Sequence, residues 1–469
     1  MIDTLAIRNN ILRLAFSGKL TDGRETDDKV EDLLVRVSPK KRIVQNDDVP
    51  HEIPETWAWV KLSDLYKINP KVEADESIDA AFIPMEKISS GFDDHFAYEV
   101  QSWGQASKSH TKFRDEDVAF AKISPCFENR KSFIARDLPN GIGGGTTELI
   151  ILRQKEMLPE YTYYIVTDQR FINTGAASYK GTVGQQRVQS DVIKNYYVPV
   201  PPISEQKRIV DIVQASFAIL NEIDSSQQQY LTNLDALRSK ILDAAILGKL
   251  TEQLSTDGNA TELLEKIKED RKNDIKEGKI KKDTQVSSIH EEELIHDIPS
   301  NWIWVRLGSI VTVLGGKRIP AGRKLTTENT GHKYIRVSEM KDRSVKTDSL
   351  LYVPEDIYPT ISQYVINKED VYITVAGTIG RVGKIPAEID GANLTENADR
   401  LVFSNLDQDW LIYCLSSSIV QKQIELLTTQ VAQPKLAIKR IQEFLIPLPP
   451  LKEQKRIAER INNVLASVS

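Results

Sequence analysis

An internal repeat constrains the fold more than any other feature of this sequence, because three separate segments recur in the same order. Residues 15–21, AFSGKLT, return at 245–251 as AILGKLT. Residues 51–62, HEIPETWAWVKL, return at 296–307 as HDIPSNWIWVRL. Residues 199–209, PVPPISEQKRI, return at 447–457 as PLPPLKEQKRI. The repeat predicts two similar structural units.

A long amphipathic pattern lies between the central repeat segments. From Ile209 to residue 244, positions that step alternately by four and three are apolar, except Ser216 and Gln227. This spacing is typical of the a and d positions of a coiled coil. We therefore predict a helix from about Ser204 to Leu247, roughly 65 Å long at about 1.5 Å per residue, with Gly248 as its C-terminal stop.

The two ends of the chain carry the two halves of the same helical pattern. Residues 457–468 repeat the first half at an offset of 248 residues, and residues 7–18 repeat the second half at an offset of 230 residues. The chain is therefore expected to behave as a ring of two units that is opened inside one helical region. Two similar antiparallel helices should face each other.

Two blocks of about 150 residues lie between the helical segments, and each opens with a Trp-x-Trp segment. Alternating apolar residues predict strands at 117–123 and 370–376, and residues 161–171 and 410–427 are predicted to be helical. The predicted fold is α/β (α+β), with two similar mixed domains in a pseudo-twofold arrangement, separated by a pair of long antiparallel coiled-coil helices. The predicted domains are residues 1–49 (N-terminal half of the helical region), 50–200 (first mixed domain), 201–290 (central helical region with a basic linker), 291–446 (second mixed domain) and 447–469 (C-terminal helix).

The composition is that of a soluble protein of several domains. A chain of 469 residues is too long for one hydrophobic core. No run approaches the roughly 18 apolar residues of a membrane span, and the first residues lack an export signal, so we expect a cytoplasmic protein. Cys126 and Cys414 are isolated, which indicates neither a disulfide nor a metal site, and both are expected to be buried. The net charge of −6 argues mildly against nucleic-acid binding, although a local basic strip suffices for contact.

These motifs together resemble the specificity subunits of type I restriction-modification systems, over essentially the whole chain. The resemblance is carried by the doubled PPxxEQKRI, GKLT and Trp-x-Trp segments, FAKISPCFEN at 120–129 and GTIGRVG at 377–383. It implies two target-recognition domains, at 50–200 and 291–446, each reading one half of a bipartite double-stranded DNA site. It also implies docking of two methyltransferase (M) subunits and of restriction and motor (R) subunits. The basic extension after Leu254 departs from the family pattern, and the charged stretch around 271–282 is expected to be a solvated helix end or linker.

The resemblance implies no chemistry within this chain. No cofactor is expected here, whereas S-adenosylmethionine, ATP and Mg are expected in the partner subunits. No catalytic or metal-binding residue is predicted. The partner contacts are placed on the start of the two long helices, at Glu205, Gln206, Lys207, Arg208, Glu453, Gln454, Lys455 and Arg456.

Motifs of catalysis are incomplete in the sequence. The glycine-rich segment 141–147 lacks the residues of a P-loop or dinucleotide fingerprint, so we predict a tight turn between strands. Asn69-Pro70-Lys71 lacks the rest of an amino-methyltransferase loop, and the matched His51 and His296 indicate a structural role. Two rival hypotheses stay open: a self-sufficient restriction or methylation enzyme, and a coiled-coil scaffold that binds no DNA.

The strongest cationic cluster of the second mixed domain is GGKRIPAGRK at 315–324. Such a Gly/Pro loop can approach phosphates closely and place arginine in a groove. The alternative is a solvated basic loop, and the resemblance favours DNA contact. The DNA-binding candidates of this domain are Lys317, Arg318, Arg323, Lys324, Arg336, Lys341, Arg343, Thr378 and Arg381.

In the first mixed domain, cations stand beside amides that can pair with adenine edges. Gln185 and Arg187 match Gln433 and Lys435 at an offset of 248 residues, so we interpret these positions as a shared structural or phosphate-binding element. Base readout should fall where the two halves differ. The four tryptophans of the Trp-x-Trp segments are predicted to pack in the core. The remaining DNA-binding candidates are Lys122, Asn129, Arg130, Lys131, Lys180 and Gln186.

Overall fold

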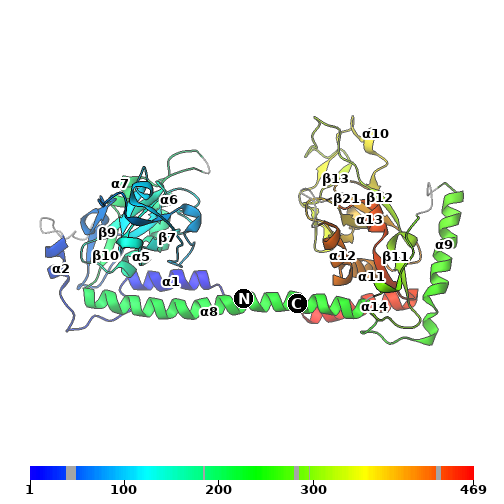
Figure 1. The fold of residues 1–469 in the computed structure, drawn as a ribbon, viewed down its shortest axis with the longest axis horizontal. Coiled ribbons are helices and arrows are strands. Elements are labelled where there is room, and N and C mark those ends of the chain that lie inside the picture. The colour runs from blue at the N-terminus through cyan, green and yellow to red at the C-terminus, as the bar shows by residue number, and fades with distance from the viewer. Residues whose placement is uncertain (38–48, 183–184, 279–284, 295, 429–434, 469) are drawn as a thin grey trace. The chain divides into compact units, whose positions relative to one another are not determined.

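The structure, a computed structural model, describes residues 1–37, 49–182, 185–278, 285–294, 296–428 and 435–468 (Figure 1). It divides into two compact units, Met1–Gln229 and Tyr230–Ser469. The division falls inside the 44-residue helix α8 (Ile203–Ile246). The predicted long helix is therefore confirmed to within one residue at each end.

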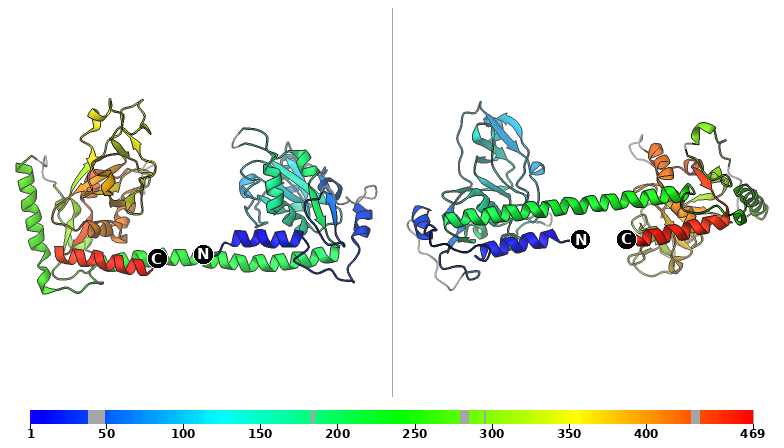
Figure 2. Two further views of the ribbon diagram at one scale, coloured as in Figure 1. Left: turned by 180° about the vertical axis from the view of Figure 1, so that it is seen from behind. Right: turned by 90° about the horizontal axis from the view of Figure 1, so that it is seen from below.

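In unit 1, helix α1 (Thr4–Phe16) lies antiparallel to the first half of α8 (Figure 2). Thr4 Oγ1 donates to Asp224 at 2.5 Å. The buried guanidinium of Arg8 donates to Asn221 at 2.7 Å and forms an ion pair with Asp224 at 2.9 Å. Residue numbers therefore rise along α1 as they fall along α8, so the two helices are antiparallel, as predicted.

Unit 2 repeats this pairing with its helices in the opposite chain order. The second half of α8 lies antiparallel to α14 (Leu451–Ser467) (Figures 1 and 2). Leu242 and Ile246 of α8 share one buried cluster with Ile457 and Ile461 of α14. The two halves of α8 therefore belong to different units, and each pairs with a helix from one end of the chain, which is the predicted ring.

The mixed domain of unit 1 contains one strand pair and two four-stranded sheets. The pair is β1 (Ala58–Lys61) with β10 (Tyr197–Val200). The first sheet has the order β2 (Tyr66–Ile68), β9 (Leu149–Gln154), β6 (Val118–Ala121), β7 (Ser132–Ile134). The second has the order β4 (Glu99–Ser102), β3 (Asp79–Ile83), β8 (Ile142–Gly145), β5 (Thr111–Arg114), in which β3 and β8 are parallel.

Unit 2 has the same topology strand for strand. Its strand pair is β11 (Ile303–Arg306) with β22 (Leu445–Leu448). Its first sheet is β12 (Thr312–Gly315), β21 (Ala398–Val402), β18 (Val371–Thr374), β19 (Val382–Lys384). Its second is β16 (Leu351–Tyr352), β13 (Lys333–Ile335), β20 (Ala392–Leu394), β17 (Val365–Ile366), with β13 and β20 parallel. A hairpin of β14 (Met340–Lys341) and β15 (Ser344–Val345) is added. The prediction of two similar mixed domains is confirmed.

The remaining helices cover the sheets or carry connections. In unit 1 they are α2 (Val30–Val37), α3 (Leu62–Leu65), α4 (Trp103–Ala106), α5 (Pro159–Thr167), α6 (Gln169–Ala176) and α7 (Ser190–Lys194). In unit 2 they are α9 (Ala260–Lys276), α10 (Tyr358–Ile361), α11 (Gln408–Ser416), α12 (Ser418–Thr428) and α13 (Ile438–Gln442). The charged stretch at 271–282 is the end of α9 as far as Lys276, and residues 279–284 lie outside the described residues.

Two predicted helices are each broken once. The extended residues Asp168 and Ser417 interrupt the segments predicted as single helices. Asp168 then caps α6, because its carboxylate accepts a hydrogen bond from Arg170 N at 3.1 Å. Apolar periodicity continues across both breaks, so it could not locate them.

The glycine-rich segment is mostly a strand, and the turn that joins this strand to the next begins only at its last residue, Thr147. Residues 142–145 form β8, an interior strand of the second sheet. A Cβ atom on Gly144 would stand 1.8 Å from Ala106 O, and one on Gly143 would stand 2.5 Å from the Phe113 ring. Glycine is required here because neighbouring backbone and side chains occupy the space of a Cβ atom.

A buried carboxylate joins helix, strand and loop in unit 1. Glu205, on the first turn of α8, accepts hydrogen bonds from Trp57 Nε1 at 2.9 Å and from Thr21 Oγ1 at 2.8 Å. The preceding Gly18 has a φ of 67°, and a Cβ atom there would lie 2.3 Å from the Pro54 ring. The GKLT, Trp-x-Trp and EQKR segments of the sequence therefore meet at one point.

Unit 2 contains the same junction. Glu453 of α14 accepts hydrogen bonds from Trp302 Nε1 at 2.8 Å and from Thr251 Oγ1 at 3.0 Å. The core positions predicted for the tryptophans are confirmed for Trp57, Trp59 and Trp302, which are buried, while Trp304 is half-buried. The three repeated segments therefore contain the residues that form this junction in both units.

Truncating this carboxylate should destabilise the unit that contains it. In Glu205→Ala the buried Trp57 indole N–H loses its acceptor, which costs about 1–3 kcal/mol of unfolding free energy. Calorimetric melting of the full chain should show a lower transition midpoint. Lys207→Ala, an exposed neighbour on the same helix, is the control and should leave the midpoint unchanged; an equal effect of both variants would contradict this role.

Candidate nucleic-acid interface

Four of the DNA-binding candidates of unit 2 lie at one edge of its first sheet, where three strands begin or end. Strand β21 runs antiparallel to both β12 and β18, so the ends of β12 and β18 lie beside the start of β21. Lys317 and Arg318 follow β12, Thr378 and Arg381 follow β18, and Glu396 precedes β21. All four candidates are exposed.

The loop after β12 packs closely against the segment before β21. Lys317 N donates to Leu394 O at 2.8 Å, and a Cβ atom on Gly316 would lie 2.0 Å from Thr395 O. Arg318 forms an ion pair with Glu396 at 2.5 Å although 73% of its side chain is exposed. The sheet edge thus holds Arg318 beside a carboxylate.

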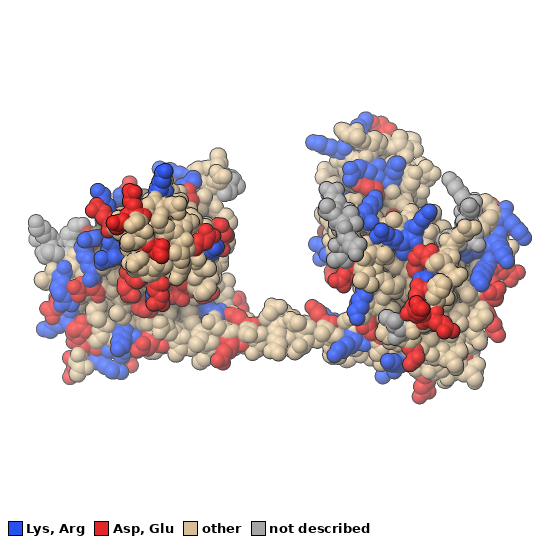
Figure 3. Space-filling view, viewed as in Figure 1, with Lys and Arg blue, Asp and Glu red and all other residues tan. Residues whose placement is uncertain are grey.

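All three arginines predicted from the 315–336 region form ion pairs with carboxylates. Arg323 forms an ion pair with Asp356, and Arg336 forms one with the buried Glu339 at 2.5 Å. Lys324 is exposed. On the face drawn in Figure 3, acidic side chains stand among the basic ones in both units.

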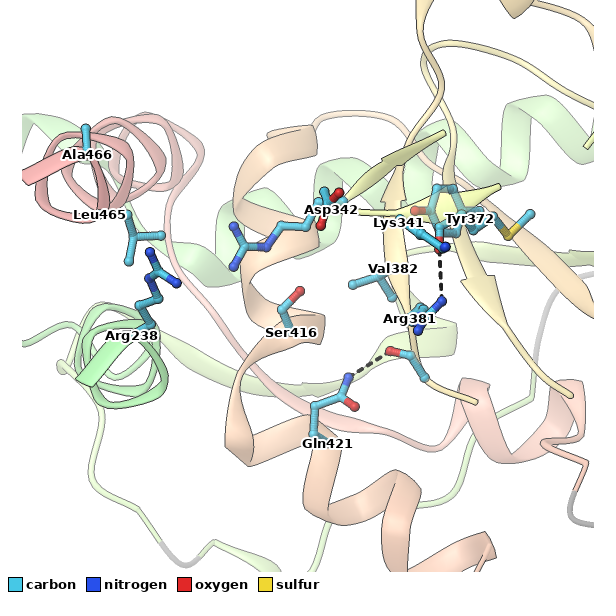
Figure 4. Close-up of a pocket in the computed structure, with 13 residues that line it drawn as sticks. Arg238, Lys341, Asp342, Tyr372, Arg381, Val382, Ser416, Gln421, Leu465 and Ala466 are labelled. Atoms are coloured by element: carbon cyan, nitrogen blue, oxygen red, sulfur yellow. Dashed lines mark hydrogen bonds between the residues drawn. The ribbon is translucent and has the colours of Figure 1, made fainter. Parts of the chain in front are cut away.

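A second group of cations lines an open cavity of about 700 Å³ in unit 2 (Figure 4). Lys341 and Arg343 come from the β14–β15 hairpin, Arg381 from the β18–β19 loop, and Arg238 from α8. Arg343 lies 5.1 Å above the Tyr413 ring. Arg381 Nη1 donates to Met340 O at 3.3 Å, which directs the guanidinium along the cavity wall.

This cavity carries excess positive charge. Within the described part of the chain, Lys341, Arg343 and Arg381 form no ion pair. Asp342 is the one carboxylate among the described lining residues, and it stands 3.9 Å from Lys346. Arg238 was missed by sequence reasoning, since on a helix an Arg three residues after Asp235 indicates only a surface pair. The cavity is thus the least neutralised cationic surface built by the candidates.

At the equivalent sheet edge of unit 1, the candidates Arg187 and Lys122 lie close to the carboxylate of Glu148. Arg187 donates two hydrogen bonds to this carboxylate, from Nε at 2.9 Å and Nη2 at 2.7 Å. The hydrogen bond from Arg187 is the largest cause that lowers the pKa of Glu148, and the charge of Lys122 adds to it. Lys180, Gln185 and Asn129 are exposed, and Gln186 and Lys122 are half-buried.

The backbone places Arg187 and Lys435 at equivalent positions. Val188 N donates to Lys122 O at 2.9 Å, and Leu436 N donates to Val375 O at 2.9 Å, at the matching points of the two sheets. Lys435 Nζ lies 3.4 Å from Glu396 O. Gln433, which the sequence pairs with Gln185, lies outside the described residues.

Arg130 faces the protein interior and requires a correction. Its side chain is 8% exposed and donates to Thr167 O at 2.8 Å and to Gln169 Oε1 at 2.5 Å, above the Phe92 ring. Burial lowers the pKa of this guanidinium. A residue engaged in this way has no surface for DNA, so its role is structural. Lys131 is half-buried and donates to Met85 O at 2.8 Å.

The residues predicted to bind partners mostly serve the internal junctions. Glu205, Gln206, Glu453 and Gln454 are buried. Gln206 Nε2 donates to Pro201 O at 3.0 Å, and Gln454 Nε2 donates to Pro449 O at 2.9 Å.

The two arginines of this motif are also engaged within their own units. Arg208 forms a bidentate pair with Asp27 at 2.7 Å, and Arg456 forms one with Asp257 at 2.6 Å. The Arg208 side chain holds the pKa of Asp27 well below its usual range. Lys207 and Lys455 are exposed, and for these two a partner contact stays a prediction.

The buried carboxyl of Asp399 lies on β21, beneath the basic edge. It is 4% exposed, and its Oδ2 has no hydrogen-bond partner among the described atoms. Burial raises the pKa of Asp399 to about 7, and the charge of Lys435 opposes this rise. Elsewhere, no cluster of three or more His, Cys, Asp or Glu residues in the described ranges could hold a metal ion, and no described helix is long and apolar enough to cross a membrane.

A duplicated mixed α/β domain, with a basic sheet edge in each copy, defines a protein with two recognition domains. The family model for the type I restriction modification DNA specificity domain matches residues 54–233 and 299–468. The chain belongs to this family and carries two copies of the domain.

Curated relatives and a solved structure agree with this assignment. The chain is 28% identical to the EcoEI specificity subunit of Escherichia coli, over 97% of this chain and 88% of that protein. It is also 28% identical to the EcoAI specificity subunit of Escherichia coli, over 98% and 88%. A structure solved to explain complex assembly and conformational transition of the type I R-M system superposes with a TM-score of 0.64 at 21% identity, over 89% of this chain and 92% of that one. This last likeness shows the fold.

Titration of Asp399 should make the stability of unit 2 depend on pH. The folded pKa of about 7 lies above the usual value of about 3.9 in an unfolded chain. The folded state therefore keeps a proton that the unfolded state releases, and the stability that this proton contributes is present below about pH 4 and lost as the pH rises to about 7.

Asp399→Asn keeps the shape of the side chain without titrating. The melting temperature of this variant should depend less on pH between about 4 and 7, and the difference corresponds to at most about 4 kcal/mol. Asp348→Asn, at an exposed carboxylate, is the control. An unchanged pH profile in Asp399→Asn would show that the carboxyl titrates normally.

Proposed function

We propose that this chain is the DNA sequence-specificity subunit of a type I restriction-modification complex, and that each unit reads one half of a bipartite site in double-stranded DNA. It performs no methylation or cleavage itself. The observation that carries the proposal is the cationic cavity with its adjoining sheet edge, on a chain with two DNA specificity domains.

The cavity suits a phosphodiester backbone. Three unpaired cations from two separate loops face one open volume, and Arg238 adds a fourth from the long helix. Unpaired Lys and Arg side chains gain more from a phosphate than those already bonded to a carboxylate. The hairpin β14–β15 and the β18–β19 loop are then placed to direct neighbouring side chains at base edges.

The partners follow from the same proposal. Two methyltransferase subunits dock on the helical frame, and restriction and motor subunits complete the restricting complex. S-adenosylmethionine, ATP and Mg act in those partners. In this proposal, the length of the helical region between the recognition domains fixes the separation of the two half-sites near one turn of the duplex.

Replacing cavity cations should weaken DNA binding and its salt dependence. In Arg343→Ala and Arg381→Ala, each lost phosphate contact should lower the slope of log affinity against log salt by about 0.9. A salt series with a random-sequence duplex measures this slope. Lys266→Ala, an exposed cation on α9, is the control. If both variants show the slope of the unmodified chain, the cavity is not part of the DNA interface. If the chain retains no duplex even when M subunits are present, a scaffold that binds no DNA is favoured.

The division of labour between the units predicts a modular target. Exchanging residues 60–195 for the equivalent block of a relative leaves the Glu205 and Glu453 junctions in place, so assembly should persist and one half-site should change. Methylome sequencing of cells carrying the chimera reports both half-sites. A motif altered in both halves would contradict one unit reading one half-site.

A further inference from the structure

We propose that Glu148 and Glu396 are specificity-determining residues, whose carboxylates neutralise the arginines of the two basic edges until a matching base edge replaces that contact. The inference rests on the DNA-binding function proposed above. It assigns to two carboxylates a role that would otherwise be sought among cations alone.

The two carboxylates occupy matching places in the two units. Glu148 directly precedes β9, and Glu396 lies two residues before β21, the equivalent strand. The side chains are 22% and 21% exposed, so each is held at the edge and still reaches solvent. Each is thus placed where a ligand that approaches the cations would meet it.

Each carboxylate is bonded to an arginine that remains largely exposed. Arg187 is 45% exposed and makes its bidentate pair with Glu148. Arg318 is 73% exposed and pairs with Glu396. Desolvation raises the pKa of both carboxyls and is the largest single effect at Glu396. Hydrogen bonds from these arginines act in the opposite direction, and the pKa of both carboxyls is lowered overall. Both groups are therefore charged at neutral pH.

A charged carboxylate at this place discriminates between ligands. A phosphate that approaches Arg187 or Arg318 must displace a group of its own sign, which lowers affinity for any backbone without a compensating contact. A carboxylate accepts hydrogen bonds and donates none, so among major-groove edges it favours the amino groups of adenine N6 and cytosine N4. When a phosphate takes the arginine away from the carboxylate, only a DNA sequence with such an amino group can give the carboxylate a new hydrogen-bond donor.

Other ion pairs of the basic region lack this arrangement. Asp356, the partner of Arg323, is 59% exposed and lies on the connection after β16. Glu339 is buried beneath Arg336. Neither stands at the start of the strand that both units share.

The experiment uses the full chain with its methyltransferase subunit and a library of duplexes with random sequence. Retained DNA is quantified and sequenced for the unmodified chain, Glu148→Gln and Glu396→Gln. Both substitutions keep the shape of the side chain and remove its charge. Total retention should rise about threefold to tenfold in each variant. Each variant should also lose about tenfold of the enrichment of one half-site, and the half-site that Glu148→Gln affects should differ from the one that Glu396→Gln affects.

Matched controls test charge removal elsewhere in each unit. Glu99→Gln in unit 1 and Glu265→Gln in unit 2 remove exposed carboxylates that pair with Lys87 and Lys268. Retention and enrichment should stay unchanged in both. Arg187→Ala should lower retention, since Glu148 then remains without its cation.

The sign of the effect separates the proposal from misfolding, because unfolding lowers retention in every variant. Lower or unchanged retention in Glu148→Gln and Glu396→Gln, or unchanged enrichment of both half-sites, would overturn the inference while leaving the proposed function intact. If the unmodified chain enriches no bipartite motif, the proposed function itself fails.

Discussion

The buried contact between a glutamate on the first helical turn and a tryptophan indole underlies the architecture of both units. Glu205 and Glu453 each bond the helix to the strand pair and to the loop that follows the other helix. A buried carboxylate must have its acceptor sites filled, so the three segments can hardly diverge independently. This requirement explains why these short segments are repeated closely, whereas the blocks between them are not.

The ring-like order of the chain follows from where these junctions lie. Each unit closes its helix pair with one half of α8 and one helix from an end of the chain, and its main buried cluster stays within that unit. A chain opened inside one helical region therefore still completes two equivalent units. The sheet edges do not carry the junction, so residues there can change without disturbing it.

Sequence reasoning succeeded where the signal was local or repeated and failed where it depended on distant neighbours. Periodicity located α8, and the repeat located the junction strands. The strand β8 was missed because its glycines are explained by Ala106 and Phe113, which lie outside the motif. Arg130 was misassigned because its partners, Thr167 and Gln169, are distant in sequence. Most of the cations were identified although Arg238 was missed, and the sequence could not show which of them carboxylates neutralise.

The net charge of −6 and a DNA-binding surface are compatible because neutralisation is local. The protein pairs Arg187 and Arg318 with carboxylates and leaves Lys341, Arg343 and Arg381 without an ion pair among the described residues. If none of these cations were paired with a carboxylate, they would bind the phosphates of any duplex, whatever its sequence. A protein that must search many sites gains from having part of its charge offset, because residence on wrong sequences then shortens. The cations without an ion pair supply attraction, the arginines paired with carboxylates supply discrimination, and unit 2 holds both.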